Sequence, residues 1–321
     1  GDVFDRGENP DKIMELLIRH HNADVQWGNH DIQWMGAHMG NLACIMSVVD
    51  ISLKYGNADL LEEGYGISLR KLSTYASEYM DDDPRFYPAG VDPAAAGEEA
   101  RLCAKMRKAA FLMQLKAEGA IISRRPEYGM QDRNILANID FKQGTFFGAK
   151  LSRPSFPNVD TEHPLAFTPE EREVAQALRR SFRSGEKLSR HIAFLMRNGS
   201  AYKICNNNLI FHGCVPMEED GSYMNFCGHE GRDLLDYCES MVRRAYAAFR
   251  RGDEDEEALD FFFYLWCGRG SPLYGREKIT TFERLYSDDP ALHVEEDNSY
   301  YKWCKQRDFC ERVLRDFGIS G

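Results

Sequence analysis

The stretch that decides the fold is residues 1–31, which read GDVFDRG at positions 1–7 and GNHD at positions 28–31. Between these two motifs, residues 11–21 predict a helix, and residues 24–27 predict a short apolar strand. A strand-helix-strand unit places both motifs at the carboxyl ends of adjacent parallel strands, where open α/β sheets bind their ligands. The sequence therefore predicts an α/β fold whose functional site is built from these two motifs.

The two motifs supply the groups of a metal-assisted phosphate site. Carboxylate, amide and imidazole groups bind divalent ions, and the guanidinium of Arg6 can hold a phosphate through two parallel hydrogen bonds. We expect Asp2 to bridge two ions held roughly 3.5–4 Å apart. Asn29 would ligate one of these ions without adding charge.

His30 and Asp5 are the expected proton-transfer pair. His30 directly follows the ligand Asn29 and could protonate the leaving alkoxide, while Asp5 could orient the imidazole and raise its basicity. The nucleophile would be a metal-bound hydroxide, because a bound divalent ion lowers the pKa of water. Each motif alone also fits an ordinary turn or polar loop, but their order and spacing favour the functional interpretation.

Together the motifs resemble the calcineurin-like metallophosphatase signature GDxxDRG…GNH[ED]. A third segment, NLIFHGCVP at residues 208–216, places His212 after an apolar strand and is similar to that family's third metal-ligand motif. Longer strings resemble the manganese-dependent class III fructose-1,6-bisphosphatases of bacteria over nearly the whole chain. These strings are WGNHDIQWMGA at 27–37, LEEGYGI at 61–67, IISRRPE at 121–127 and WCGRGSPL at 266–273.

This resemblance implies a fold, a reaction and a cofactor. The fold would be a calcineurin-like metallophosphatase sheet, and the reaction would be hydrolysis of fructose 1,6-bisphosphate to fructose 6-phosphate and phosphate, in gluconeogenesis. Two Mn²⁺ ions would be the cofactor, with Asp2, Asn29 and His212 at ligand positions. Another phosphoesterase of the same superfamily, acting on a phosphoprotein or a dinucleoside polyphosphate, is the alternative.

Two parts of the family pattern are absent from the sequence. It contains no Asp-x-His triplet for the first strand, and no Gly-His-(Thr/Val)-Pro strand end follows His212. The one Gly-His pair ends at His229, which we expect to lead into a helix. We therefore expect a central piece of a longer protein, incomplete at both ends, with reduced or absent metal binding. A catalytically silent fragment is the third possible interpretation.

The domain organisation follows from a helical block inside the α/β pattern. Residues 1–56 and 199–321 are expected to form one metallophosphatase domain, and residues 57–198 a mostly helical insertion packed on it. Further expected elements are helical segments at 32–55, 98–118, 168–182, 186–198, 232–251 and 302–317, a strand pair at 201–205 and 209–211, and a buried aromatic helix at 261–266.

Three arginines outside the motifs are candidates for substrate binding. Arg124 and Arg125, which precede Pro126, form either a solvated positive patch or a contact to the second phosphate of the sugar. Arg269 lies in the glycine-rich segment 267–275 and could contact sugar or phosphate.

Composition limits the partners and the compartment. The 321 residues are 43% hydrophobic and 12% aromatic, which predicts a globular core. A net charge of −11 argues against a nucleic-acid surface and would repel an anionic sugar phosphate, so metal ions and local Arg and Lys side chains must overcome that repulsion. The small sugar bisphosphate expected as the partner is what the family resemblance implies. No apolar run approaches the roughly 18 residues of a membrane span. Nine cysteines without a C-x-x-C spacing indicate free thiols in a reducing cytoplasm. Assembly into a homo-oligomer is left open.

Overall fold

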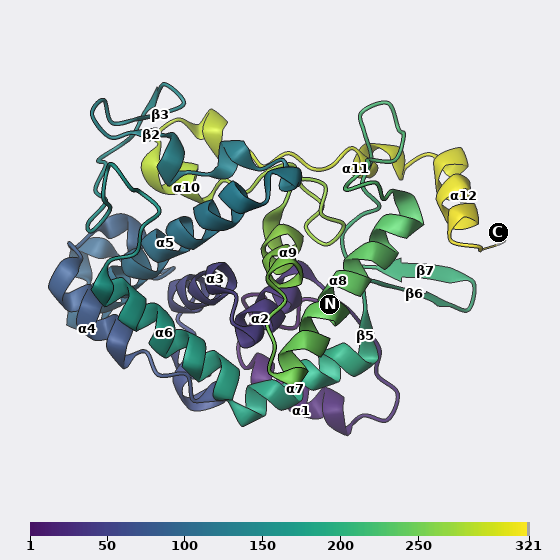
Figure 1. The fold of residues 1–321 in the computed structure, drawn as a ribbon, viewed down its shortest axis with the longest axis horizontal. Coiled ribbons are helices and arrows are strands. Elements are labelled where there is room, and N and C mark those ends of the chain that lie inside the picture. Colours follow the sequence, from purple (N-terminus) through teal and green to yellow (C-terminus); the bar gives the residue numbers. More distant parts are fainter. Residues whose placement is uncertain (320–321) are drawn as a thin grey trace.

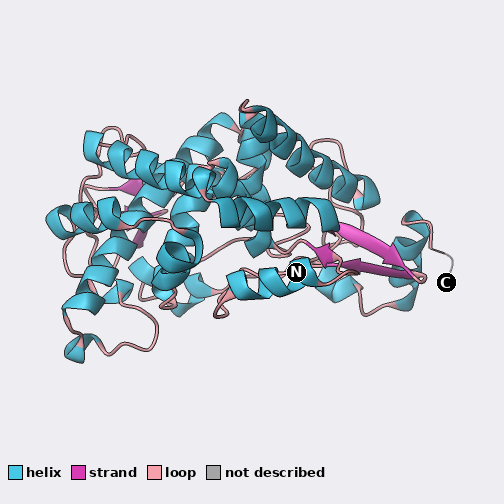
Figure 2. Ribbon diagram, turned by 90° about the horizontal axis from the view of Figure 1, so that it is seen from below, coloured by secondary structure: helices cyan, strands magenta, loops and turns pink. Residues whose placement is uncertain are grey.

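The structure is a computed structural model that describes residues 1–319. These residues are mostly helical and contain three small sheets. Figure 1 shows α2 and α3 near the centre, α4, α5 and α6 on one side, and β6, β7 and α12 on the other. Figure 2 shows how few strands accompany the helices. The predicted mixture of helices and strands is confirmed in this coarse sense.

The elements have the following bounds. The α-helices are α1 (Pro10–Arg19), α2 (Asn29–Met39), α3 (Leu42–Lys54), α4 (Arg70–Tyr79), α5 (Glu98–Arg124), α6 (Pro169–Ser184), α7 (Glu186–Asn198), α8 (Gly231–Arg251), α9 (Glu256–Cys267), α10 (Thr281–Tyr286), α11 (Tyr300–Trp303) and α12 (Arg307–Asp316). The strands are β1 (Val25–Gln26), β2 (Ile139–Asp140), β3 (Thr145–Phe146), β4 (Ala149–Lys150), β5 (Gly199–Ser200), β6 (Tyr202–Cys205) and β7 (Asn208–Phe211). A π-helical turn forms η1 (Leu60–Gly64), and 3₁₀ turns form η2 (Pro84–Phe86), η3 (Pro93–Ala95), η4 (Pro126–Tyr128), η5 (Gln131–Arg133), η6 (Leu136–Asn138) and η7 (Pro290–His293).

The second sequence motif forms the start of the most buried helix, α2. Every residue of α2 is buried, as expected for a helix whose apolar side chains face all directions. Helices α3, α6 and α9 pack around it. The prediction of one helical segment over residues 32–55 is wrong in one respect. Gly40, at φ 100°, ends α2 in the left-handed conformation, and the side chain of Asn41 caps α3 by accepting from the N–H of Cys44.

The parallel pairing near the first motifs is short. Strand β1 pairs with β5 through Val25 opposite Gly199 and Gln26 opposite Ser200. Residues 1–7 are irregular, so the strand expected to end at Asp2 is not seen within residues 1–319. The strand pair predicted at 201–205 and 209–211 is confirmed, because β6 and β7 form an antiparallel hairpin.

The largest hydrophobic core draws on both predicted parts of the chain. It contains side chains from α2, α3 and α9 together with side chains from α4 to α7 of the predicted insertion. The aromatic helix α9 is buried over its length except at its first turn, as predicted. The predicted boundaries of the helical insertion, at residues 57 and 198, remain a prediction. A shared core is compatible both with one undivided domain and with an insertion packed on a domain.

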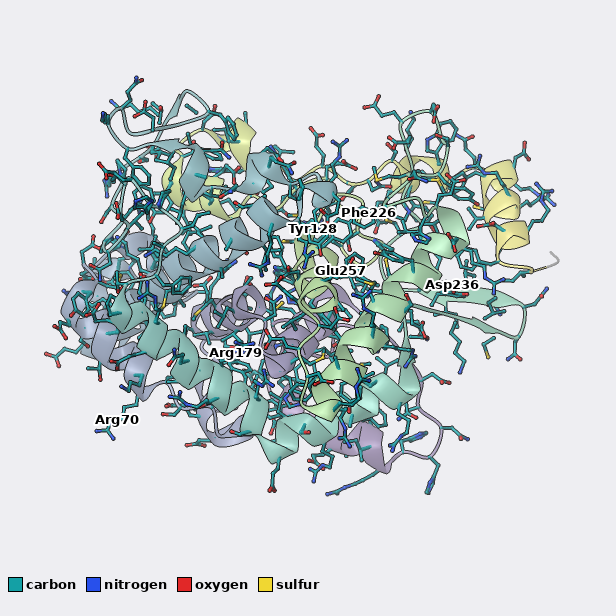
Figure 3. The ribbon with its side chains drawn as sticks, viewed as in Figure 1. Arg70, Tyr128, Arg179, Phe226, Asp236 and Glu257 are labelled. Carbon is teal, nitrogen blue, oxygen red and sulfur yellow. The ribbon has the colours of Figure 1, made fainter. Side chains whose placement is uncertain are left out.

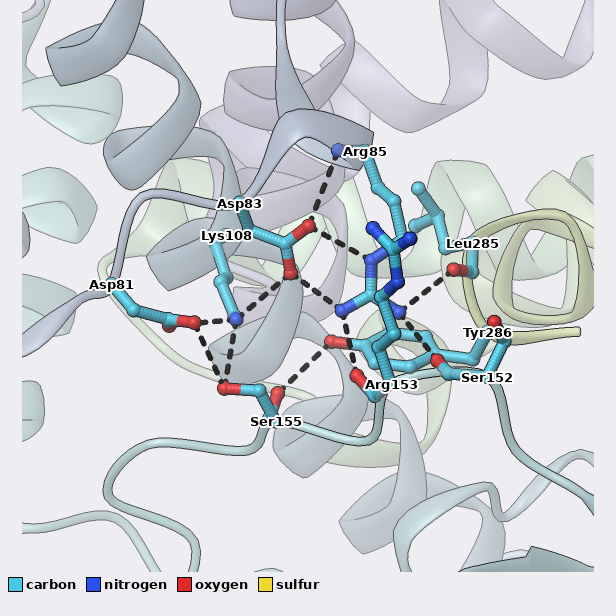
Figure 4. A network of polar contacts seen from close by, with 9 residues as sticks. All are labelled: Asp81, Asp83, Arg85, Lys108, Ser152, Arg153, Ser155, Leu285 and Tyr286. Atoms are coloured by element: carbon cyan, nitrogen blue, oxygen red, sulfur yellow. Dashed lines mark hydrogen bonds and ion pairs between the residues drawn. The ribbon is translucent and has the colours of Figure 1, made fainter.

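A polar network joins the segment around η2 to α5 and α10. The Nζ atom of Lys108, which is fully buried, lies 2.7 Å from Asp81 and 3.0 Å from Asp83 (Figure 4). Arg85 completes the network by bonding to Asp83 and to the backbone carbonyl of Leu285. Helix α10 is therefore tied to α5 through charged groups as well as apolar contacts.

Aromatic rings hold the loop after β7 against α9. Tyr128 and Phe226 lie close together near one end of α9 (Figure 3), with ring centroids 6.2 Å apart. The ring of Phe226 also stacks on Tyr264 of α9 at 4.1 Å. The predicted helix at 302–317 is interrupted, because α11 ends at Trp303 and α12 begins at Arg307.

Two expectations from the composition concern membrane-spanning helices and disulfides in the described residues. Within residues 1–319, no helix has the length and apolar character needed to cross a bilayer. All nine cysteines are free, as their spacing predicted.

Candidate metal and phosphate site

The carboxylate of Asp31 joins the two N-terminal motifs. It is fully buried and accepts hydrogen bonds from the backbone N–H groups of Asp2 at 2.7 Å and Gly28 at 3.0 Å. Burial raises the pKa of Asp31, and the charge of Asp2 acts in the same direction, although both hydrogen bonds oppose the shift. Sequence reasoning assigned Asp31 no role. An acid three residues after the N-cap Gly28 was the available signal, since this spacing is that of a capping box.

Asp2 lies at the centre of the site in a strained backbone conformation. Its φ of 57° is in the left-handed region, which is uncommon for a residue other than glycine. Its Oδ1 atom accepts from the N–H of His30 at 3.1 Å, and its Oδ2 atom lies 3.2 Å from Nε2 of His212. Burial raises the pKa of Asp2, but the contacts with His212 and His30 outweigh burial and leave the pKa below its usual value.

His212 directly follows the last residue of β7, as predicted. The next residue, Gly213, fits tightly against the backbone carbonyls of Pro272 and Leu273, and a side chain there would overlap them. The N–H of Cys214 donates to the carbonyl of Pro272 at 2.9 Å. The glycine-rich segment 267–275 therefore supports the backbone that carries His212.

Asn29 presents its side-chain oxygen to the site. Its Nδ2 donates to the backbone carbonyl of Trp266 at 3.2 Å, which uses the amino half of the amide and leaves Oδ1 available. The same tryptophan packs its ring edge-on against His30 at 4.6 Å between centroids. Trp266 therefore orients both residues that follow Gly28.

The predicted proton-transfer pair is assembled in the structure. Nε2 of His30 lies 2.9 Å from Oδ1 of Asp5, and Nε of Arg6 lies 3.2 Å from the same oxygen. The His30 imidazole lowers the pKa of Asp5 below its usual value, and Arg6 acts in the same direction while burial opposes both. The guanidinium of Arg6 is largely exposed, so it can still meet a phosphate.

All six residues predicted from the three motifs line one cavity of about 560 Å³. The cavity therefore collects Asp2, Asp5, Arg6, Asn29, His30 and His212 from separate parts of the chain. Its wall also includes residues that sequence reasoning did not single out for this site: Lys54, Tyr55, Gln114, Trp266, Tyr274, Arg276, Arg284 and Glu295.

The three arginines predicted to bind substrate do not line this cavity. Arg124 and Arg125 both pair with the buried carboxylate of Asp260, at 2.8 and 2.9 Å. Arg269 pairs with Glu277 at 2.8 Å. The structure gives all three arginines carboxylate partners, and their predicted contact with substrate remains a prediction.

The residues present fit a divalent ion of the manganese type. Asp2, Asn29 and His212 offer a carboxylate, an amide oxygen and an imidazole, a donor set that suits Mn²⁺. Within residues 1–319, no group of three or more His, Cys, Asp and Glu side chains is arranged to hold a metal ion. The candidate ligands Asp2 and His212 are two such side chains, and Asn29 adds an amide oxygen. His229, in the one Gly-His pair of the sequence, contacts Asp233 at 2.7 Å.

Comparisons with known proteins agree on one family. The model for the Firmicute fructose-1,6-bisphosphatase family matches residues 1–321. The chain is 42% identical over 330 residues to the class 3 fructose-1,6-bisphosphatase of Clostridium botulinum (strain Okra / Type B1), covering 100% of the chain and 49% of that relative.

Relatives from other bacteria match to a similar degree. Identity is 42% over 335 residues to the class 3 fructose-1,6-bisphosphatase of Bacteroides fragilis (strain YCH46), covering 100% of the chain and 50% of the relative. It is 41% over 335 residues to that of Ligilactobacillus salivarius (strain UCC118), covering 100% and 51%. The chain thus spans about half the length of the curated relatives it matches. No solved structure matches it.

Proposed function

The chain belongs to the Firmicute fructose-1,6-bisphosphatase family, and from this we propose that the full-length protein hydrolyses fructose 1,6-bisphosphate to fructose 6-phosphate and phosphate. The observation that carries the proposal is the convergence of Asp2, Asn29, His212, Arg6 and His30 on one cavity. These residues come from three motifs, and the cavity contains both a donor set for cations and a guanidinium for phosphate.

We propose that Asp2, Asn29 and His212 hold Mn²⁺. When bound, the metal would polarise the phosphate and lower the pKa of water toward neutrality. Asp31 and Trp266 would keep the ligands in place through the hydrogen bonds described above. Arg6 would bind the phosphate that is cleaved, because its guanidinium lies at the cavity wall beside Asp5.

His30 would deliver a proton to the leaving alkoxide. Its contact with Asp5 at 2.9 Å restricts the orientation of the imidazole. The edge-on ring of Trp266 restricts the imidazole from another side. The fructose product would leave as the alcohol once its oxygen has taken this proton.

The fold and cellular setting are part of the same proposal. The parallel pair β1–β5 would belong to a calcineurin-like metallophosphatase sheet, with residues 57–198 as an insertion. The nine free cysteines are consistent with a cytoplasmic enzyme of gluconeogenesis.

Phosphate release by the purified full-length protein tests the proposal. With Mn²⁺ present, fructose 1,6-bisphosphate should be the preferred substrate over a phosphoprotein and a dinucleoside polyphosphate, and a chelator should abolish the activity. Equal or faster turnover of either competitor would refute the substrate assignment. The 321-residue chain assayed beside it shows whether this portion alone is active, and no activity there would support the third interpretation for the isolated chain.

A further inference from the structure

We propose that Lys54 binds the phosphate of the substrate that is not cleaved. This inference rests on the proposed function, because it assigns the second phosphate of a sugar bisphosphate to the same cavity. Lys54 is the last residue of α3, lines the cavity and is partly buried. Arg124 and Arg125, which the sequence also suggested for this role, do not line this cavity.

The position of Lys54 is set by an aromatic ring that it shares with Arg6. The Nζ atom of Lys54 lies 5.4 Å from the ring centroid of Tyr55, and the guanidinium carbon of Arg6 lies 5.5 Å from the same centroid. Cation–π contacts of this kind hold a cation without neutralising its charge. Two positive groups therefore lie against one aromatic ring of the cavity wall.

The carboxylates nearby are already engaged. Asp5 contacts both Arg6 and His30. Asp50, one helical turn before Lys54, lines the same cavity, but its Oδ1 accepts from Nε of the buried Arg107 at 3.1 Å. Within residues 1–319, Lys54 forms no ion pair with a carboxylate. Its charge is thus available to an anion that enters the cavity.

The other cations of the cavity are less available. Arg276 pairs with Glu295, and Arg284 donates to Thr280 and to the carbonyl of His293. These arginines have protein partners that fix their guanidinium groups. Lys54 lies on the Arg6 side of the site, so a substrate whose cleaved phosphate is bound by Arg6 can reach Lys54 with its second phosphate.

Two substrates that differ only in the second phosphate test this inference. Fructose 1,6-bisphosphate and fructose 1-phosphate share the phosphate to be cleaved, and only the former carries the group assigned to Lys54. In the full-length protein with Mn²⁺, Lys54→Met should raise the KM for the bisphosphate about 10- to 150-fold, the factor expected for a lost hydrogen bond to a charged group. The kcat should stay within about threefold, and the KM for fructose 1-phosphate should not change.

Matched variants separate this role from a structural one. Lys54→Arg should restore most of the affinity because it keeps the charge, and Lys150→Met, at an exposed lysine outside the cavity, should have no effect. Direct binding of fructose 6-phosphate without metal should weaken in Lys54→Met. Tyr55→Leu, which removes the ring that Lys54 and Arg6 share, should weaken bisphosphate binding.

The outcomes distinguish the two proposals. If the wild type hydrolyses the bisphosphate but Lys54→Met raises neither KM, or raises both equally, the assignment of Lys54 is wrong and the proposed function stands. If the wild type does not hydrolyse the bisphosphate at all, the proposed function itself fails.

Discussion

Oδ2 of Asp2 lies 3.2 Å from Nε2 of His212, although the two residues are 210 positions apart in the sequence. A carboxylate oxygen and an imidazole nitrogen this close can both reach a single cation that enters between them. The contact brings together the first and third sequence motifs, and the predictions about metal start from it.

Removing either partner of this contact should weaken metal binding. Asp2→Asn and His212→Ala are each expected to lower the affinity of the full-length protein for Mn²⁺ by at least about 10- to 100-fold, since losing an outer-shell partner alone can cost that much. Isothermal titration calorimetry with Mn²⁺ measures the change in affinity. His229→Ala is the control because His229 contacts Asp233 instead, and an equal loss in that variant would contradict the ligand assignment.

Removing the imidazole of His30 should slow catalysis more than binding. His30→Gln is expected to lower kcat by about 10²- to 10⁴-fold, the usual contribution of a positioned proton donor, with a smaller change in KM. Asp5→Asn should lower kcat less, because Asp5 acts through His30. In the double variant the effects should not multiply, since both residues serve one proton transfer. Full multiplication would show that the two residues act independently.

Replacing Asp31 should loosen the junction between the two N-terminal motifs. The N–H groups of Asp2 and Gly28 both donate to Oδ2 of Asp31, so Asp31→Asn removes the negative charge that they share. Its amide NH₂ group would also replace Oδ1, which accepts from the N–H of Phe4 at 3.4 Å. We expect a loss of about 1–3 kcal/mol in the free energy of unfolding, together with weaker Mn²⁺ binding. Urea unfolding provides the measurement. The exposed Asp288→Asn should leave both properties unchanged.

Glu118 should make stability depend on pH. Burial raises its pKa to about 7 from an ordinary 4.5, against the opposing effects of Gln114 and Arg133. Below about pH 4.5 the carboxyl is protonated in both states and costs nothing. As the pH rises toward 7, Glu118 ionises readily in the unfolded state but not in the folded state. The free energy of unfolding therefore falls over this pH range.

Glu118→Gln removes this titration. The variant should gain up to about 3 kcal/mol over the wild type at pH 8 and little at pH 4.5, at 1.36 kcal/mol per pKa unit. Unfolding by urea at both pH values measures the difference. Glu127→Gln, at an exposed position, is the control. An equal gain at both pH values would mean that packing, not ionisation, explains the effect.

The buried ion pair between α5 and α6 should be costly to break. Nζ of Lys116 lies 2.7 Å from Oε2 of Glu171, and both side chains are almost fully buried. Lys116→Met leaves a buried carboxylate without its cation and should cost about 3–5 kcal/mol. The exposed pair of Lys71 and Glu173 is the matched control, and Lys71→Met should cost less than about 1 kcal/mol.

A double replacement separates charge from packing at the same position. Lys116→Met combined with Glu171→Leu should recover most of the lost stability, because no uncompensated charge remains. Thermal or urea unfolding of the single and the double variant measures the difference in stability. A double variant as unstable as the single one would show that the remaining hydrogen bonds of Glu171, including that from Tyr75, dominate.

Local signals predicted the parts of this molecule that depend on neighbouring residues. The helix after Pro169 and the hairpin before His212 were predictable, because caps, periodicity and turns are encoded within a few residues. The convergence of the motifs was also anticipated. Its geometry supports the candidate roles of Asp2 and Asn29, which remain to be measured.

Features that depend on distant partners could not be predicted. Arg124 and Arg125 have the composition of an anion site, but both pair with Asp260, more than 130 positions later. Lys54 belongs to no motif, and only packing brings it beside Arg6. The break at Gly40 was missed because the hydrophobic pattern continues across it.

The glycine of the second motif has a consequence for how such motifs are recognised. A β-carbon at Gly28 would overlap the carboxylate of Asp2, so the carboxylate occupies the space that a side chain at position 28 would need. This glycine is therefore complementary in shape to a residue in the other motif. In divergent members of the family, a larger residue at this position should be accompanied by the loss or displacement of the acid, and the two positions should change together in evolution.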